Sequence, residues 1–142
     1  MDKMYLQVNP QSMPKNLAEY FSRYSAKTLI VSLIQENRDL EDALGVADSI
    51  IYDNQDYLSG IIDLEDVIIN INENLDLIPS SYKIKKNELD FDNFSQKIEE
   101  LEYDNFIYIF SDHADFKLEN KPVSKDLKPS LWDKIKGIFK NG

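Results

Sequence analysis

Four short runs of apolar residues stand out along the chain. They are nearly continuous rather than alternating, and several are rich in β-branched side chains, which is the pattern of parallel strands buried on both faces. We therefore predict strands at residues 4–8, 29–33, 75–78 and 106–110.

Segments with helical spacing of apolar residues lie between these runs. Two longer helices are predicted, at residues 15–24 and at residues 90–101, and Asp90 is the expected N-cap of the second. Each should lay one apolar face on the sheet. These faces consist of Leu17, Tyr20, Phe21 and Tyr24 in the first helix and of Phe91, Phe94, Ile98 and Leu101 in the second.

Three shorter helical segments are predicted in the middle of the chain. Residues 39–44 and 53–58 are expected to end at Gly45 and Gly60, because glycine adopts the left-handed conformation that stops a helix. A third short turn is predicted at residues 63–67, with Asp63 as its cap.

The order of these elements is strand, helix, strand, helices, strand, helix, strand, which is typical of a parallel α/β sheet with right-handed crossovers. We predict a three-layer α/β sandwich around a short, mainly parallel sheet of about four strands. The edge left open on this sheet should be covered by the chain's own tail or by another chain.

Composition places the protein among soluble globular domains. With 142 residues, 42% of them hydrophobic and 30% charged, the chain is long enough for one domain with a sizeable core. No apolar run approaches the roughly 18 residues of a membrane span, and the N-terminus lacks the apolar core of a signal peptide. The absence of cysteine excludes a disulfide framework and fits a cytoplasmic protein.

Charge divides the chain into two parts. Residues 1–116 hold nine basic and 23 acidic residues, a net charge of −14, whereas residues 117–142 hold seven basic and three acidic residues, a net charge of +4. We predict a domain at residues 1–116, a linker at residues 117–130 and an amphipathic helix at residues 131–140.

The predicted terminal helix has an apolar face and a basic face. Trp and Phe on one side with lysines on the other are typical of an interfacial membrane helix. The same spacing also serves a helix that packs on its own sheet or docks into a partner's groove, so all three alternatives remain open. The candidate membrane-binding or partner-binding residues are Leu131, Trp132, Lys134, Ile135, Lys136, Ile138, Phe139 and Lys140.

Four segments in order resemble the MinD/ParA family of P-loop ATPases. LIVSLIQENRDLEDALGV (residues 29–46) is similar to the family's second strand and following loop, and YDNQDYLSGIIDLEDVI (52–68) is similar to a short helix and turn. NLDLIPSS (74–81) and ELEYDNFIYIF (100–110) resemble two later strands. The resemblance implies the N-terminal half of a P-loop domain, and members of the MinD group often end in a short amphipathic targeting helix.

The residues that handle nucleotide in that family are replaced here. A P-loop requires glycines, a lysine and a Ser/Thr hydroxyl, but NPQSMPKNLAEYF (residues 9–21) contains no glycine and the loop is shortened before Asn16. By the resemblance, two family aspartates fall on Ser32 and Ile34, and the Walker B aspartate falls on Ile109. The degenerate nucleotide-site positions are Ser12, Lys15, Ser32, Ile34 and Ile109. We expect no ATP hydrolysis, no cofactor and no metal site.

Other polar clusters carry weaker signals. His113 lies near Ser111, Asp112 and Asp115, and we interpret this cluster as a polar loop after the last strand rather than a catalytic set. The acidic runs ENRDLED (residues 36–42) and DLED (63–66) are interpreted as solvated helix faces. Nucleic-acid binding is not expected at a net charge of −10.

These patterns favour a truncated, non-catalytic MinD/ParA-like adaptor or positioning factor. Its expected partner is a true ATPase of that family or a second copy in a homodimer, and it is expected in the cytoplasm, attached weakly to the inner face of the cell membrane by its tail. One alternative is a regulatory protein with residual nucleotide binding, in which Lys15 would contact phosphate. Another is a soluble acidic inhibitor or nucleic-acid mimic.

Overall fold

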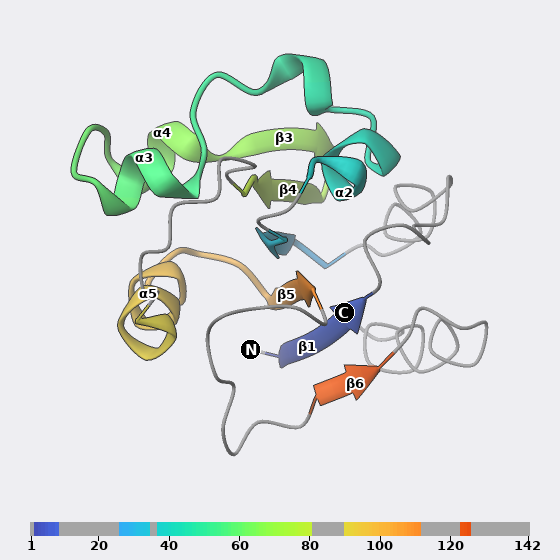
Figure 1. The fold of residues 1–142 in the computed structure, drawn as a ribbon. Helices are drawn as coiled ribbons and strands as arrows, with labels where there is room; N and C mark the ends of the chain where they lie inside the picture. The colour runs from blue at the N-terminus through green and yellow to red at the C-terminus, as the bar shows by residue number, and fades with distance from the viewer. Residues whose placement is uncertain (1, 9–25, 35–36, 81–89, 112–122, 126–142) are drawn as a thin grey trace.

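The computed structural model describes residues 2–8, 26–34, 37–80, 90–111 and 123–125. Within these residues six strands form one sheet in the order β3-β4-β2-β5-β1-β6 (Figure 1). All neighbouring strands are parallel except β3 and β4, which are antiparallel. The strands are β1 (Asp2–Val8), β2 (Thr28–Leu33), β3 (Ile69–Asn72), β4 (Leu75–Ile78), β5 (Asn105–Ser111) and β6 (Val123–Lys125).

The centre of the sheet is formed by strands that are far apart in sequence. β5 pairs with β1 from Asp2↔Asn105 to Val8↔Ser111 and with β2 from Thr28↔Asn105 to Leu33↔Phe110. Every residue of β2 and β5 is buried. Their continuous apolar sequences therefore match their central position, as the hydrophobic pattern predicts.

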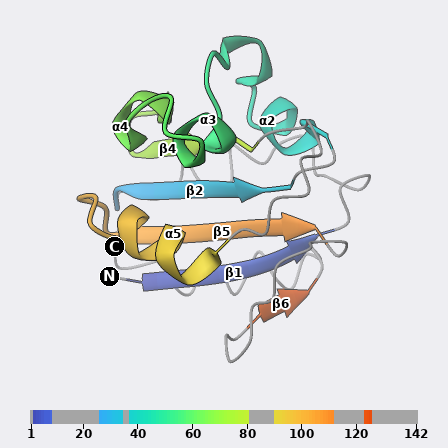
Figure 2. The ribbon, with the colours of Figure 1, turned by 60° about the vertical axis from the view of Figure 1, so that its left-hand side comes forward.

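Helices and connecting segments bury both faces of the sheet, so the predicted three-layer α/β sandwich is confirmed. One face is aliphatic, and α2 (Asp39–Ala43) contributes Leu40 to its core next to Leu44. The other face is rich in aromatic residues and is covered by α3 (Asn54–Leu58), α4 (Leu64–Val67) and α5 (Phe91–Ile98) (Figure 2). A short 3₁₀ helix, η1 (Ala47–Ser49), connects α2 to the segment that leads into α3.

Two glycines end the short helices as predicted. Gly45 and Gly60 both have φ of +77°, in the left-handed region. After α2, the Val46 N–H donates to the Glu41 carbonyl at 3.0 Å and the Gly45 N–H donates to the Asp42 carbonyl at 2.9 Å. This is the bonding of a Schellman motif, which satisfies the last carbonyl groups of a helix.

The predicted helix caps differ in outcome. The Asp90 carboxylate accepts from the Asn93 N–H, which confirms its role at the start of α5. Asp63 occupies the N-cap position of α4, but its side chain makes no capping hydrogen bond. The prediction that the Asp63 side chain caps this helix is therefore wrong.

Two strands are present that the hydrophobic pattern does not predict. β3 forms an antiparallel pair with β4 at one edge of the sheet, and its alternating Ile and Asn residues give no continuous apolar run. β6 pairs with β1 at the opposite edge and lies within residues 117–130, where the composition indicates a linker. The division at residues 116 and 130 stays a prediction.

Several predicted features lie outside the described residues. They are the helix at residues 15–24, the polar cluster around His113 and the amphipathic helix at residues 131–140, together with Ser12 and Lys15. Among the described residues, no helix has the length and hydropathy needed to cross a membrane.

Candidate functional site

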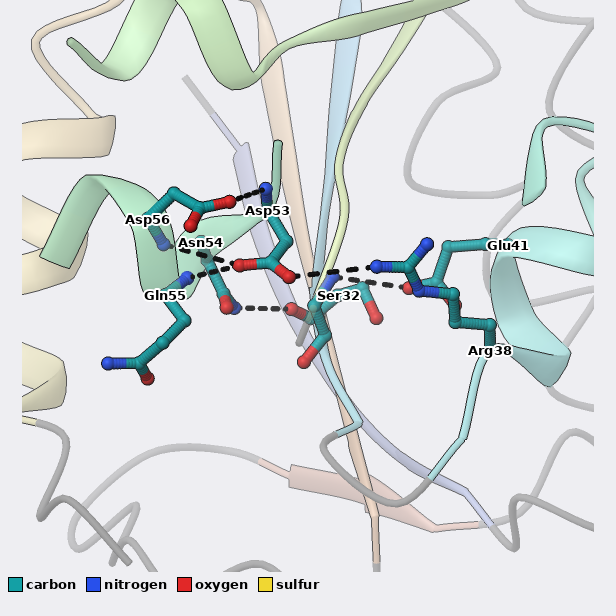
Figure 3. A network of polar contacts seen from close by, with 8 residues as sticks. Ser32, Arg38, Glu41, Asp53, Asn54, Gln55 and Asp56 are labelled. Carbon is teal, nitrogen blue, oxygen red and sulfur yellow. Dashed lines mark hydrogen bonds and ion pairs between the residues drawn. The ribbon is translucent and has the colours of Figure 1, made fainter. Parts of the chain in front are cut away.

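The carboxyl ends of β2 and β4 meet the beginnings of two helices. Open α/β sheets bind ligands at this edge, so its polar side chains are the first candidates for a site. Ser32 lies near the end of β2, Ser80 follows β4, and both are fully buried. Figure 3 shows that side chains from the α2 and α3 regions, among them Glu41 and Asn54, gather around Ser32.

Asn54 connects the start of α3 to both strands. Its side-chain amide donates to the Ser32 carbonyl at 3.1 Å, and its backbone N–H donates to the Pro79 carbonyl at 2.9 Å. Asn54 is only 2% exposed. The end of β2 and the segment after β4 are therefore fixed to the same helical turn.

Asp53 precedes Asn54 and closes a capping box. Its carboxylate accepts from the backbone N–H groups of Gln55 and Asp56, and the Asp56 carboxylate accepts from the Asp53 N–H at 3.0 Å. The second Asp53 oxygen lies 3.6 Å from an Nη atom of Arg38, just before α2 (Figure 3). This ion pair links the starts of α2 and α3.

Glu41 is a fully buried carboxylate on α2. Its Oε1 accepts from the Ser80 N–H at 3.3 Å, whereas its Oε2 and the Ser32 Oγ have no hydrogen-bond partner of good geometry among the described residues. Burial raises the pKa of Glu41, and the Ser32 hydroxyl, the Ser80 N–H and the Arg38 guanidinium partly oppose this rise. The prediction that the ENRDLED run is a solvated helix face is therefore wrong for Glu41.

This arrangement offers little ligand chemistry. Glu41 is the one fully buried carboxylate among the described residues, and these residues contain no cluster of three or more His, Cys, Asp or Glu side chains placed to hold a metal ion. Mg²⁺ prefers several oxygen ligands in octahedral geometry, and one buried carboxylate does not supply them. The polar contacts instead connect secondary-structure elements to one another.

Three of the predicted nucleotide-site positions lie within the described residues. Ser32, Ile34 and Ile109 are all 0% exposed. Ile34 and Ile109 belong to the aliphatic cluster on the α2 side of the sheet, and Ile109 is in register with Ser32 on β2 and with Leu6 on β1. These two isoleucine side chains are packed in apolar surroundings.

The sequence did not indicate most residues of this polar network. Its contacts join segments that are far apart along the chain, from 15 residues between Arg38 and Asp53 to 39 residues between Glu41 and Ser80. The sequence did contain one local indication of this network. Asp53 and Asp56 are three residues apart, which is the spacing of a capping box at the start of a helix.

The fold is that of the MinD and ParA-type proteins, as comparison with solved structures shows. One similar structure is the MinD cell division protein of Aquifex aeolicus, with a TM-score of 0.57 and 18% identity over 81% of this chain and 50% of that chain. A chain of the MinC:MinD cell division protein complex from the same organism has a TM-score of 0.55 and 18% identity over 76% of this chain and 47% of that chain.

A plasmid partition protein has the same fold. The putative plasmid partition protein of Borrelia burgdorferi bound to AMPPNP has a TM-score of 0.54 and 16% identity over 78% of this chain and 53% of that chain. The chain thus spans about half the length of these solved structures. No protein-family model and no curated protein sequence matches the chain. The sequence resemblance to the MinD/ParA family is therefore confirmed at the level of the fold.

Proposed function

We propose that this protein is a non-catalytic MinD/ParA-like adaptor or positioning factor. In this proposal it binds a protein partner through its α/β domain and attaches weakly to the cytoplasmic face of the membrane through residues 131–140. The partner is a MinD/ParA-type ATPase or a second copy of the chain.

The packing of Ile34 and Ile109 carries the non-catalytic part of the proposal. Both side chains are fully buried in the aliphatic cluster, at positions where the sequence resemblance places acidic residues. An isoleucine cannot ligate Mg²⁺ or position a water molecule. The strands around these positions nevertheless keep a continuous register, so the scaffold persists without the acidic groups.

Protein binding is supported by a solved complex that contains a protein of this fold. One of the similar solved structures is a complex between MinD and another protein, MinC. We propose that this chain likewise uses its α/β domain to bind protein.

Membrane attachment is supported by the sequence of the tail. Lysines near an anionic surface contribute about 1 kcal/mol each. The net charge of −14 on residues 1–116 opposes them within a Debye length of roughly 8 Å. A single tail should therefore bind weakly and reversibly, and two tails in an assembly should bind more strongly through avidity.

Residual nucleotide binding is the second candidate function. It is favoured by one observation, namely that the similar Borrelia burgdorferi structure is bound to AMPPNP. In this alternative Lys15 contacts phosphate and the protein acts as a nucleotide-dependent regulator.

A paired assay separates the two candidates. ATP hydrolysis and thermal unfolding are measured with and without Mg-ATP, with Aquifex aeolicus MinD as the parallel sample. For this chain we expect no ATP hydrolysis and no change in the midpoint temperature of thermal unfolding when Mg-ATP is added. A ligand present at 100 times its dissociation constant stabilises a protein by about 2.7 kcal/mol. If Mg-ATP clearly raises the midpoint temperature of unfolding, and if Lys15→Ala removes this rise, the nucleotide-binding alternative is established.

Membrane attachment has its own test, which is sedimentation with vesicles that contain anionic lipid. We expect the intact chain to pellet, added salt to weaken pelleting, and Ile135→Glu to abolish it. Ile135→Val is the matched control and should pellet like the intact chain. Equal pelleting of Ile135→Glu and the intact chain, or no pelleting of either, overturns attachment through the tail.

A further inference from the structure

We propose that a groove beside β3 is the docking site for a basic, amphipathic segment of a protein partner. The groove is lined by two segments, residues 49–52 and residues 62–69, and we call it the 49–69 groove. This inference rests on the partner binding proposed above and assigns it a surface and a chemistry.

The 49–69 groove has a defined volume, and most of the residues that line it have apolar side chains. It encloses about 460 Å³, and its lining includes Ile51 and Tyr52 from the first segment and Ile62 and Ile68 from the second. Ser49 and Asp66 add polar groups. Grooves of this size hold several apolar side chains, and the few polar groups at the rim provide orientation.

Two of the residues that line the groove, Ile51 and Tyr52, are exposed apolar side chains, and two more exposed apolar residues follow close by in the sequence. Among the described residues, the exposed large hydrophobic residues are Ile51, Tyr52, Leu58 and Ile61, all within one stretch of 11 positions. Ile51 is 83% exposed and Ile61 is 66% exposed. Single exposed apolar residues are common on protein surfaces, but a group of them beside a groove is typical of an interaction site.

The charge around the 49–69 groove selects the partner. Residues 39–80 contain eleven Asp and Glu residues and no Lys, Arg or His. Asp48, Asp63, Glu65 and Asp66 are exposed close to the lining residues in sequence. A segment with lysines or arginines around an apolar stripe would place its apolar side chains in the groove and its charges against this acidic rim.

The same charge argues against other occupants. An anionic lipid surface or a nucleic acid would be repelled by a stretch with no basic residue. A symmetric dimer through this face would bring two acidic surfaces together, which is unfavourable.

The basic tail of the chain itself has limited reach. β6 and β3 lie at opposite edges of the sheet, five strand spacings or about 24 Å apart. The six steps from Lys125 to Leu131 span at most about 22 Å. Leu131 therefore falls short of β3, only the later residues of the tail extend to the groove, and the variant Ile135→Glu below tests that occupant.

Fluorescence anisotropy with a defined probe tests the proposal on the chain of 142 residues. The probe is a labelled peptide made only of leucine and lysine, with the leucines on one helix face. The control peptide has glutamate at every lysine position. We expect the basic peptide to bind and the acidic peptide not to bind.

Variants locate the binding surface. Ile51→Ser should weaken binding of the basic peptide by about tenfold or more, because the most exposed apolar side chain of the groove lining is lost. Asp66→Asn should weaken it about two- to fivefold, as the loss of one exposed charge does. Glu102→Gln removes an exposed acid on the α5 side and should leave affinity unchanged. Unfolding midpoints show whether each variant is folded.

Three outcomes overturn the proposal. If Ile51→Ser and the unmodified chain bind the basic peptide with equal affinity, the peptide binds to the negative charge of the protein and not to the groove. A rise of tenfold or more in affinity caused by Ile135→Glu shows that the chain's own tail occupies the groove. A dimer in sedimentation velocity that Ile51→Ser dissociates shows that a second copy occupies it. ATP hydrolysis by the chain would instead overturn the proposed function and leave the measured peptide affinities as they stand.

Discussion

The carboxyl edge of the sheet differs sharply between its centre and the region beside β3. At the centre, Ile34 and Ile109 are fully buried in the aliphatic cluster, and Glu41 is buried beside Ser32 and Ser80. Beside β3, Ile51 lines the 49–69 groove and is exposed within a stretch rich in acidic residues. Within the described residues, the positions at the end of β2 and on β5 are thus packed against side chains of the chain itself, while apolar surface is available for contacts beside β3. This contrast favours a protein partner over a small ligand.

The strongest test of the contrast inserts a charge at a central position. We expect Ile109→Asp to lower the free energy of unfolding by about 3–5 kcal/mol or to prevent folding, because it leaves a carboxylate unpaired in the apolar core. Chemical denaturation measures the change. Ile109→Val should cost only about 0.5–1.5 kcal/mol, and a small loss for Ile109→Asp would show that the centre of the edge admits water or a counter-ion.

Asn54 fixes the packing at this edge, and removing its amide should weaken it. We expect Asn54→Ala to cost about 1–3 kcal/mol of unfolding free energy, because the Ser32 carbonyl would lose its side-chain donor in a buried position. Urea denaturation checks this value. Gln55→Ala changes the neighbouring residue, whose side chain bonds an exposed Ser59 hydroxyl, and should change stability by less than about 0.5 kcal/mol.

Glu41 makes the stability of this edge depend on pH. Burial raises the pKa of the Glu41 carboxyl above the ordinary value of 4.5. The contribution of Glu41 to the free energy of unfolding is therefore complete below pH 4.5, where the carboxyl is protonated, and is lost as the pH rises through its pKa in the folded state. We expect Glu41→Gln to be more stable than the unmodified chain at neutral pH, because the amide keeps an acceptor for the Ser80 N–H and carries no charge to be desolvated.

Thermal melts across pH 4–8 test this prediction. The difference between Glu41→Gln and the unmodified chain should grow from pH 4.5 upward. The control is Glu102→Gln, which should follow the unmodified chain because Glu102 is exposed. A constant difference at all pH values would show that the Glu41 charge is solvated or fully paired.

The smallest effect is expected at the 49–69 groove. Ile51→Asp introduces the same charge as Ile109→Asp but on a side chain that is 83% exposed, so stability should change by no more than about 0.5 kcal/mol. Chemical denaturation under the same conditions gives the comparison. A loss of several kcal/mol would show that Ile51 belongs to the core and would weaken the case for a docking surface.

The buried strands were predictable because their signal is local. β2, β4 and β5 are short apolar runs, and the glycines at 45 and 60 mark the helix ends by their conformational freedom. β3 was missed because Asn70 and Asn72 alternate with its isoleucines, so the sequence contains no continuous apolar run. The strand lies at an edge of the sheet, where its residues are half-buried or exposed. β6 has three residues in a polar segment, and only its pairing with β1 identifies it.

The polar contacts at the carboxyl edge were not predictable in the same way. Glu41 has the sequence context of a surface helix, with Asp39 and Asp42 close by, and its burial depends on Ser80 being brought to it from the end of β4. The exposure of Ile51 is equally a property of the fold, since an isoleucine in a sequence is expected to be buried. The burial of Glu41 and the exposure of Ile51 both depend on tertiary packing, which the spacing of apolar residues along the sequence does not predict.

The pairing of β1 with β5 has a consequence for synthesis of the chain. Asp2 is paired with Asn105, so β1 waits for about 100 further residues to be made before its central neighbour exists. At about 5–20 residues per second, translation leaves β1 without that neighbour for roughly 5–20 s. During this interval Met4, Leu6 and Val8 lack their final apolar contacts, so the nascent chain carries exposed apolar surface until β5 has been made.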